Sequence, residues 1–105
     1  MQVTVVDHIV YDYEELTITN AAIVSFTATK YRPASGTKPA KSIFCRLQTT
    51  NCYYQLDGST TVLTTGSGIL LKVDETLELL NSSDIVNFRI ISTGANATLR
   101  VFYRR

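Results

Sequence analysis

The second half of the chain alternates short apolar and polar stretches with turn residues, and this pattern restricts the fold more than any other feature. Between Tyr53 and Arg105, each stretch rich in Val, Ile, Leu, Tyr and Phe is followed by Gly, Asn, Asp or Ser. Successive residues of a strand point to opposite faces, so such alternation predicts strands with one buried face. No segment has a sustained helical period. The sequence therefore predicts an all-β, antiparallel domain.

The same pattern extends into the first half of the chain. We expect strands at residues 2–6, 16–19, 23–29, 42–48, 52–56, 69–73, 76–80, 87–92 and 97–103, and residues 9–13 either extend the first strand or form a separate arm. Residues 49–51 and 93–96 are expected to turn two hairpins, and the polar residues before Ile85 to cap one short helical turn. These strands predict a single antiparallel β-sandwich, jelly-roll-like, with a small closed β-barrel as the alternative.

One long segment breaks the pattern. Residues 31–41 contain Pro33 and Pro39, together with Gly36. Proline lacks the backbone donor that a strand ladder needs, so this segment is expected to be a loop. It is also the most basic loop, which makes it a candidate for contact with a partner.

Size and composition indicate a single domain over residues 1–105. The chain has 105 residues, of which 45% are hydrophobic and 18% charged, and a net charge of +1. So small a net charge gives no field that would recruit nucleic acid or an anionic membrane, and no apolar run is long enough to span a bilayer. The first residues lack the features of a signal peptide, so we expect synthesis and use in a cytoplasm.

The charges are segregated along the chain. Residues 1–29 carry four acidic residues and no basic one, residues 30–46 carry five basic residues, residues 57–84 sum to −4, and residues 89–105 sum to +4. These charges are either solvated side chains of strands and loops, or acidic and basic segments that meet across subunits and direct assembly.

The two cysteines, Cys45 and Cys52, admit more than one interpretation. Two free, buried thiols in a reducing compartment are the first. A disulfide across a hairpin is the second, and it requires that the chain turn near Gln48-Thr49 with favourable antiparallel geometry. We expect no metal site, because His8 is the only histidine and the chain has no second cysteine pair.

The sequence contains no recognisable catalytic arrangement. His8 stands beside Asp7 near the start of the chain, and a surface position suits this pair better than a catalytic dyad. Gly66-Ser67-Gly68 precedes an expected strand and not a helix, so it is expected to be a tight loop that binds no phosphate. We therefore expect a protein that is not an enzyme and that needs no cofactor.

Tyrosine is the commonest aromatic residue, with six Tyr against four Phe and no Trp. Some of these rings must lie in the core. Others, interleaved with Arg, would stack bases or sugars, or would lie at a protein–protein interface, which is the commoner use of exposed tyrosine.

The last half of the chain resembles a group of small virion proteins of tailed bacteriophages. The resemblance depends on Tyr54-Gln55-Leu56-Asp57-Gly58, Gly66-Ser67-Gly68-Ile69-Leu70, Leu77-Glu78-Leu79, Asn87-Phe88-Arg89-Ile90-Ile91 and Leu99-Arg100-Val101-Phe102-Tyr103. It implies a β-sandwich virion protein, and specifically a capsid decoration (cement) protein that binds and stabilises the shell, often as a trimer. Residues 1–20 and the loop at 31–41 depart from the group.

The expected partner is accordingly a major capsid protein or another virion protein, with further copies of the chain as a homo-oligomer, and not nucleic acid or a membrane. A tail, head–tail connector or fibre-base component is one alternative role, and a carbohydrate- or receptor-binding module is another. Residues 1–15 are expected to form an acidic, tyrosine-bearing arm. The residues that we expect to contact the partner are Tyr11, Tyr13, Lys30, Tyr31, Arg32, Lys38, Lys41, Arg104 and Arg105.

Overall fold

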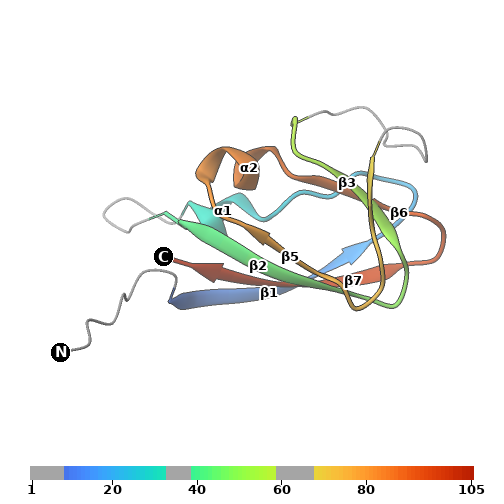
Figure 1. The fold of residues 1–105 in the computed structure, drawn as a ribbon, viewed down its shortest axis with the longest axis horizontal. Coiled ribbons are helices and arrows are strands. Elements are labelled where there is room, and N and C mark those ends of the chain that lie inside the picture. The colour runs from blue at the N-terminus through green and yellow to red at the C-terminus, as the bar shows by residue number, and fades with distance from the viewer. Residues whose placement is uncertain (1–8, 33–38, 59–67) are drawn as a thin grey trace.

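The computed structural model describes residues 9–32, 39–58 and 68–105, and these contain seven strands and two short helices (Figure 1). In chain order the elements are β1 (Val10–Ile18), α1 (Ala28–Tyr31), β2 (Ser42–Gln48), β3 (Cys52–Gln55), β4 (Ile69–Leu71), β5 (Thr76–Leu79), α2 (Ser82–Asn87), β6 (Arg89–Ser92) and β7 (Ala97–Arg104).

The strands form two antiparallel sheets that pack face to face. The four-stranded sheet has the order β1-β7-β2-β5 and the three-stranded sheet the order β4-β3-β6. Val24 adds an isolated antiparallel bridge to Ile90 on the free edge of β6, and so occupies the place of an eighth strand. Counted in this way, the two sheets have the arrangement of a jelly roll. The predicted all-β sandwich is confirmed, and the described residues do not close into a barrel.

Three of the connections that cross between the sheets lie together at one end of the sandwich, which we call the crossing end. Residues 49–51, 72–75 and 93–96 all cross there. Hydrogen bonds join these turns: the Thr93 amide donates to the Asn51 carbonyl over 3.1 Å, the Val73 amide to Asn51 Oδ1 over 2.8 Å, and Thr50 Oγ1 to the Asn96 carbonyl over 3.1 Å. The opposite end, where α1 and α2 lie, is the helical end (Figure 1).

Both expected hairpins are wrong, because the strands on either side of each turn belong to different sheets. β6 pairs with β3, whereas β7 lies between β1 and β2; likewise β2 pairs with β7 and β5 while β3 pairs with β4 and β6. A strand of a sandwich buries one face whether it pairs with its neighbour in sequence or crosses to the other sheet. The alternation therefore predicts the strands without deciding between these two connections.

Two expectations for the first third of the chain also need correction. Residues 23–29 contribute only the bridge at Val24, and the chain then turns into α1. Residues 10–15 of the predicted arm belong to β1, which pairs with β7 from Val10 to Ile18, so this part is an integral strand of the sheet. The expected strand at residues 2–6 lies outside the described residues.

The short helical turn expected before β6 is present, but Asn81 caps it and not the triplet Ser82-Ser83-Asp84 from which we expected the cap. Asn81 has an extended backbone (φ −137°, ψ 154°), and its Oδ1 accepts a hydrogen bond from the Asp84 amide over 2.8 Å. This is the bond by which an N-cap residue satisfies a free amide of the first turn. Ile85 then packs into the core with 2% of its surface exposed.

The core lies between the sheets and is formed by every second residue of the strands. β7 shows this most clearly, because its residues alternate between buried and half-buried from Ala97 to Arg104. Cys45 and Cys52 are both buried and unbonded, which confirms two free thiols and excludes the disulfide. Burial raises the pKa of Cys45 to about 12 and that of Cys52 to about 11, so both thiols stay protonated at neutral pH.

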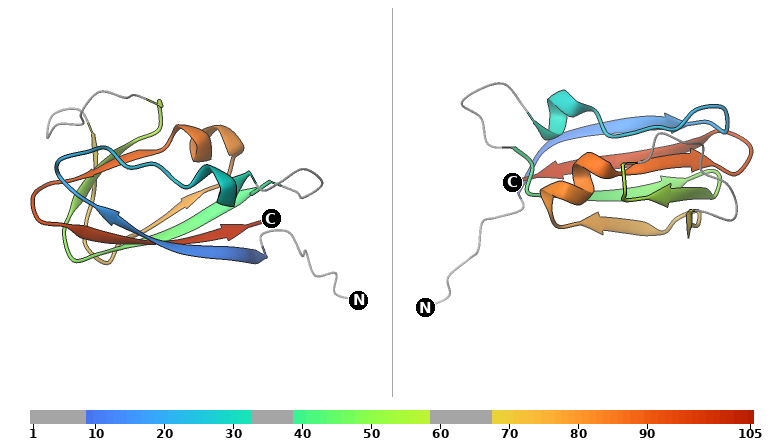
Figure 2. Two further views of the ribbon diagram at one scale, coloured as in Figure 1. Left: turned by 180° about the vertical axis from the view of Figure 1, so that it is seen from behind. Right: turned by 90° about the horizontal axis from the view of Figure 1, so that it is seen from above.

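The two lateral sides of the sandwich differ. On the β1–β6 side, the residues after β1 run back along the sandwich to α1 (Figure 2). On the β4–β5 side, the two edge strands are joined directly by the turn at residues 72–75.

Candidate interaction surface

The outer face of the four-stranded sheet carries a continuous row of aromatic side chains. The register places Tyr13 of β1 opposite Phe102 of β7, and Phe102 opposite Phe44 of β2. Ring centroids lie 4.9 Å apart for Tyr13 and Phe102 and 6.2 Å apart for Phe102 and Phe44, and each pair is tilted by 44°. Tyr13 is 37% exposed and both Phe residues are half-buried. This surface could therefore bury apolar area against a partner.

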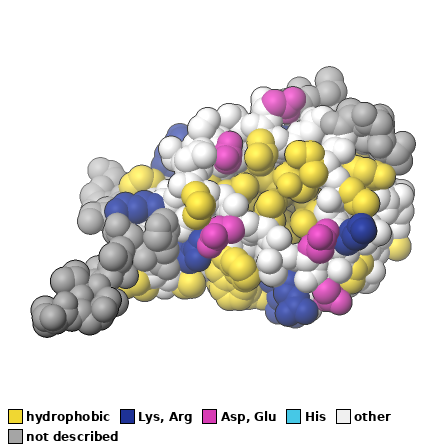
Figure 3. All heavy atoms as spheres, viewed as in Figure 1, with side chains coloured by type: hydrophobic (Ala, Val, Ile, Leu, Met, Phe, Trp, Pro, Cys, Tyr) yellow, Lys and Arg dark blue, Asp and Glu magenta, His cyan; other side chains and the backbone are white. Residues whose placement is uncertain are grey.

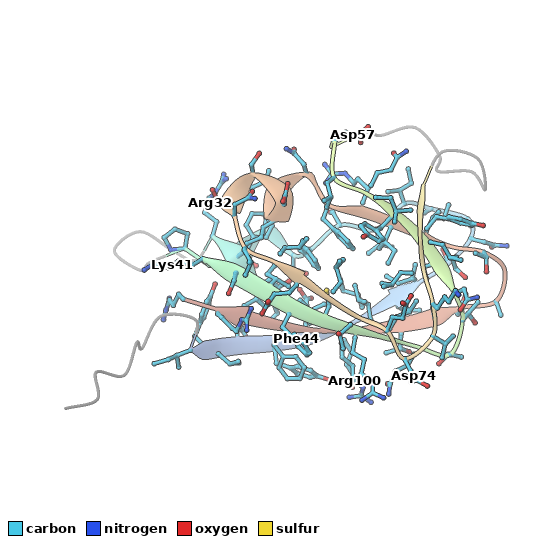
Figure 4. The ribbon with its side chains drawn as sticks, in the orientation of Figure 1. Arg32, Lys41, Phe44, Asp57, Asp74 and Arg100 are labelled. Atoms are coloured by element: carbon cyan, nitrogen blue, oxygen red, sulfur yellow. The ribbon has the colours of Figure 1, made fainter. Side chains whose placement is uncertain are left out.

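A polar row lies beside the aromatic row, one step closer to the crossing end. Arg100 stands opposite Glu15 on one side and Arg46 on the other. Its Nη1 donates to Glu15 Oε1 over 2.7 Å and to the Tyr13 hydroxyl over 2.8 Å, and its Nε donates to Gln48 Oε1 over 2.6 Å. These bonds fix the guanidinium before any partner arrives, which lowers the entropic cost of binding. Figure 4 shows Phe44 and Arg100 pointing away from the other sheet.

The segregated charges meet within one chain. Each acidic segment pairs with both basic segments. The order β1-β7-β2-β5 brings together three of the pairs, and the fourth joins β1 to Lys30 of α1. The pairs are Asp12 with Lys30, Glu15 with Arg100, Asp74 with Arg46, and Glu78 with Arg104. Pairing across subunits, which the segregation allowed, stays a prediction.

Several of the predicted contact residues gather at the helical end. The Tyr11 hydroxyl donates to the Lys30 carbonyl over 2.6 Å, and the Arg105 guanidinium lies 4.0 Å above the Tyr11 ring. Lys30 Nζ lies 3.1 Å from the Asp12 carboxylate. The Tyr13 amide and Lys30 lower the pKa of that carboxyl by hydrogen bonding. Arg104, which we expected to contact the partner, pairs with Glu78 of its own chain.

Two of the remaining predicted residues, Tyr31 and Arg32, line a small pocket. The pocket has a volume of about 230 Å³ and is lined by Tyr31, Arg32, Pro39, Ala40, Ser82, Ile85 and Val86. Lys41 is exposed at the start of β2, at the same end of the molecule as Arg32 (Figure 4). Lys38 and His8 lie outside the described residues. Those predicted contact residues that the structure describes thus divide between the helical end and Tyr13 on the aromatic row.

One carboxylate points inward, toward the other sheet. Glu14 accepts hydrogen bonds from the fully buried Tyr103 hydroxyl, from Thr27 Oγ1 over 2.7 Å and from the Thr27 amide over 3.4 Å. Burial, followed by the bond to Glu14, raises the pKa of Tyr103. Each of these bonds joins β1 to β7 or to the segment that follows β1. The Glu14 carboxylate therefore has a structural role, in which it holds these three parts of the chain together.

Sequence reasoning missed Phe44, Phe102, Arg100 and Arg46 as surface residues of interest. Alternation already placed Phe44 and Arg46 on one face of their strand. The missing information was the register, because the row forms only when β7 lies between β1 and β2, far apart in sequence.

Comparisons with protein-family models, with curated proteins and with solved structures find no match for this chain. In the part of the chain that the structure describes, no helix has the length and apolar character needed to cross a membrane.

Proposed function

We propose that this chain is a non-enzymatic structural protein of a phage virion, and specifically a decoration protein that binds the capsid shell and stabilises it. Its partner would be the major capsid protein, and it would act as a homo-oligomer, with a trimer favoured. The observation that carries the proposal is the outer face of the four-stranded sheet. The resemblance of the last half of the chain to small virion proteins is the reason for proposing a phage virion as the particle to which this face binds.

The composition of this face suits a protein partner. Aromatic residues and Arg are enriched at the centres of protein–protein interfaces and provide most of their hot spots. Here Tyr13, Phe44 and Phe102 form the apolar row, and Arg100 and Arg46 lie beside it, each paired with a carboxylate. A face whose cations are already neutralised suits a protein better than a phosphate backbone, which requires cations free to displace counterions.

The architecture is compatible with this role without deciding it. Jelly rolls are common in viral capsid and lectin domains. Because one fold serves many functions, the argument must depend on the surface.

The test is co-sedimentation of the purified protein with shells assembled from the major capsid protein encoded in the same genome. We expect saturation at many copies per shell and a higher melting temperature of the decorated shell. Phe44→Ser should weaken binding about tenfold or more, since truncation of a hot-spot residue has effects of this size. Leu70→Ser is the control, because Leu70 is 41% exposed and lies on β4 of the other sheet, away from the outer face of the four-stranded sheet.

Arg46→Ser is a second test variant, needed because Phe44→Ser could lose binding through misfolding. The Arg46 side chain is 50% exposed, so its replacement should leave the fold intact while it removes a contact. The proposal fails if the native protein does not sediment with shells, or if both variants bind as well as the native protein does. A few copies per particle would instead indicate a tail, connector or fibre-base component. Light scattering tests the trimer.

The aromatic row also favours a second candidate, a carbohydrate-binding module. Sugar rings stack on exposed aromatic side chains, and Arg100, Gln48 and Glu15 would supply donors and acceptors beside them. The row consists of Tyr13, Phe44 and Phe102, whereas Tyr31 and Tyr53 lie elsewhere. A glycan array should give signals that Tyr13→Ala abolishes if this candidate is correct, and a blank array would exclude it.

A further inference from the structure

The pocket at the helical end is formed where three segments of the chain meet. Its lining residues come from the end of α1, from the approach to β2 and from α2. The Ala40 amide donates to the Tyr31 carbonyl over 2.8 Å, and the Arg32 amide donates to the Ala28 carbonyl over the same distance. The backbone on this side of the pocket is therefore fixed before any ligand arrives, which lowers the entropic cost of binding.

Part of the pocket lining is apolar and buried. Ala40 is 5% exposed and Ile85 is 2% exposed, and both belong to the core. Val86 is half-buried and also lines the pocket. The volume of about 230 Å³ is smaller than the roughly 300–1,000 Å³ of pockets that enclose drug-sized ligands. The pocket thus fits a single ring or a single branched side chain.

Three polar side chains line the same pocket, and their polar groups have no hydrogen-bond or ion-pair partner among the described residues. They are the Tyr31 hydroxyl, the Arg32 guanidinium and the Ser82 hydroxyl. Arg32 Cζ lies 5.8 Å from the centroid of the Tyr31 ring, a contact that leaves the N–H donors of the guanidinium available. Four other basic side chains, in contrast, pair with carboxylates of this chain.

The helix that shares the pocket does not neutralise the charge of Arg32. Asp84, the acidic residue of α2, does not line the pocket, and its carboxylate accepts a hydrogen bond from Asn81 Nδ2 over 2.9 Å. Arg32 lies beside α2 at the helical end (Figure 4), and Figure 3 shows basic side chains next to hydrophobic ones at this end of the molecule. The pocket therefore combines one cation with an apolar lining.

This combination selects among anions. A guanidinium is always charged, is weakly hydrated and matches the geometry of a carboxylate with two parallel donors. A free phosphate would bring further charged oxygens against the apolar lining, where they would lose water without gaining a hydrogen bond. A carboxylate joined to an apolar group satisfies both parts of the pocket.

We propose that this pocket binds a carboxylate that is attached to a single ring or branched apolar group. The apolar group packs against Ile85 and Val86, Arg32 binds the carboxylate, and the Tyr31 and Ser82 hydroxyls supply further donors. Two sources present this chemistry, a small free acid and the C-terminal residue of another protein. The inference does not depend on the proposed function, because the aromatic row lies on the outer face of the four-stranded sheet.

The probes are matched pairs that differ only in charge. They are 3-phenylpropionate and its amide, and the peptide acetyl-Gly-Gly-Phe with a free or an amidated C-terminus, each titrated into the full chain and followed by backbone amide NMR. We expect both acids to bind, with a dissociation constant on the order of millimolar for the small one, and both amides to bind at least about tenfold more weakly. The largest shifts should lie at Tyr31, Ile85 and Val86. Tighter binding of the peptide acid than of 3-phenylpropionate would assign the site to a protein C-terminus, and the reverse order would assign it to a small acid.

Two variants that each remove one positive charge test the location. Arg32→Gln should weaken binding of the acids about tenfold or more and leave the amides unchanged, since a hydrogen bond to a charged group contributes this much. Arg32 is exposed, so its replacement should leave the fold intact. Lys72→Gln is the control, because Lys72 is exposed in the turn at residues 72–75, at the crossing end. It should leave the affinity unchanged.

Several results would overturn the proposal. No binding of either acid would exclude the site, and equal binding of acids and amides would show that the charge of Arg32 has no part in recognition. Equal losses in Arg32→Gln and Lys72→Gln would indicate a general effect of net charge. Shifts centred on the aromatic row would place the site elsewhere. Inorganic phosphate that displaces 3-phenylpropionate at equal concentration would show that the apolar lining does not contribute.

Discussion

The β1–β6 side and the β4–β5 side of this sandwich differ in how the chain covers their edge strands. On the first, the long connection after β1 crosses to the other sheet, pairs through Val24 with β6 and inserts Phe26. On the second, a turn of four residues, 72–75, crosses at once, and none of the described residues runs along the side. The length and route of a crossing connection therefore decide whether a sandwich covers its own edges.

The covered side is also held by side-chain hydrogen bonds of partly buried groups, whereas the bonds of Asp74 and Glu78 on the other side are exposed. Glu14 joins β1 to Thr27 and to Tyr103, and Tyr11 bonds to the Lys30 carbonyl. Burial of these bonds makes them expensive to disrupt, because a donor left without its acceptor also loses water.

The largest expected effect comes from removal of the inserted ring. Phe26 stacks on Phe88 at a centroid distance of 4.4 Å, so Phe26→Ala should lower the free energy of unfolding by about 3–5 kcal/mol. Ile69→Ala, on the uncovered side, should cost less than about 1 kcal/mol because the side chain is half exposed. Urea unfolding measures both, and equal losses would show that the two sides do not differ in energy.

Next in size is the loss of the inward carboxylate. Glu14→Ala removes the acceptor of the Tyr103 and Thr27 hydroxyls and should cost about 1–3 kcal/mol. Glu14→Gln keeps one acceptor oxygen and should cost less. Glu15→Ala is the comparison on the outer face, where the partly exposed pair with Arg100 contributes about 0–1 kcal/mol. If Glu15→Ala lowers the free energy of unfolding more than Glu14→Ala does, the bonds of Glu14 do not stabilise the β1–β6 side as we expect.

Alkaline pH should weaken the fold through groups that keep their protons when buried. Cys45, Cys52 and Tyr103 have folded pKa values above their ordinary values of 9.0 and 10.0. Above about pH 9 the unfolded chain releases these protons first, so stability falls as pH rises, by at most about 1.4 kcal/mol per pH unit for each group.

Unfolding free energies between about pH 8 and 11 test this dependence. Cys45→Val should flatten the decline because it removes one ionisable group. Tyr103→Phe should flatten the decline above about pH 10, because it removes the ionisable hydroxyl that bonds to Glu14 on the β1–β6 side. A decline of unchanged slope in both variants would assign the effect to other groups.

The smallest expected effect belongs to the exposed ion pairs of the outer face. Asp74 and Arg46 lie 3.4 Å apart with side chains 66% and 50% exposed. Asp74→Asn should change the unfolding free energy by less than about 0.5 kcal/mol, and salt should remove even that difference. A larger loss would mean that the turn at 72–75, and not the ion pair, depends on Asp74, whose φ is +70°.

Local pattern predicted part of this structure well. Residues 42–48 form β2 with the expected bounds, and the capped turn before Ile85 is present. Alternation also placed Val24 and Phe26 on one face of the chain, although only Val24 pairs with a strand. In each case the information lies within a few residues of the element itself.

Pairing between distant strands was beyond the same reasoning. Turns at 49–51 and 93–96 look alike whether the next strand pairs with the previous one or crosses to the other sheet. The aromatic row of Tyr13, Phe102 and Phe44 likewise depends on β7 entering between β1 and β2. Of the eight predicted contact residues that the structure describes, only Tyr13 lies on that row.

The pairing of Ile9 with Arg105 has a mechanical consequence. Each backbone amide donates to the other residue's carbonyl over 3.0 Å, so the first described residue and the last are neighbours at one end of adjacent antiparallel strands. A load applied through these two residues would pull at right angles to the strands and open the β1–β7 ladder one bond at a time. The domain would yield at low force to such a load, while a load spread over the face of the sheet would meet the whole ladder at once.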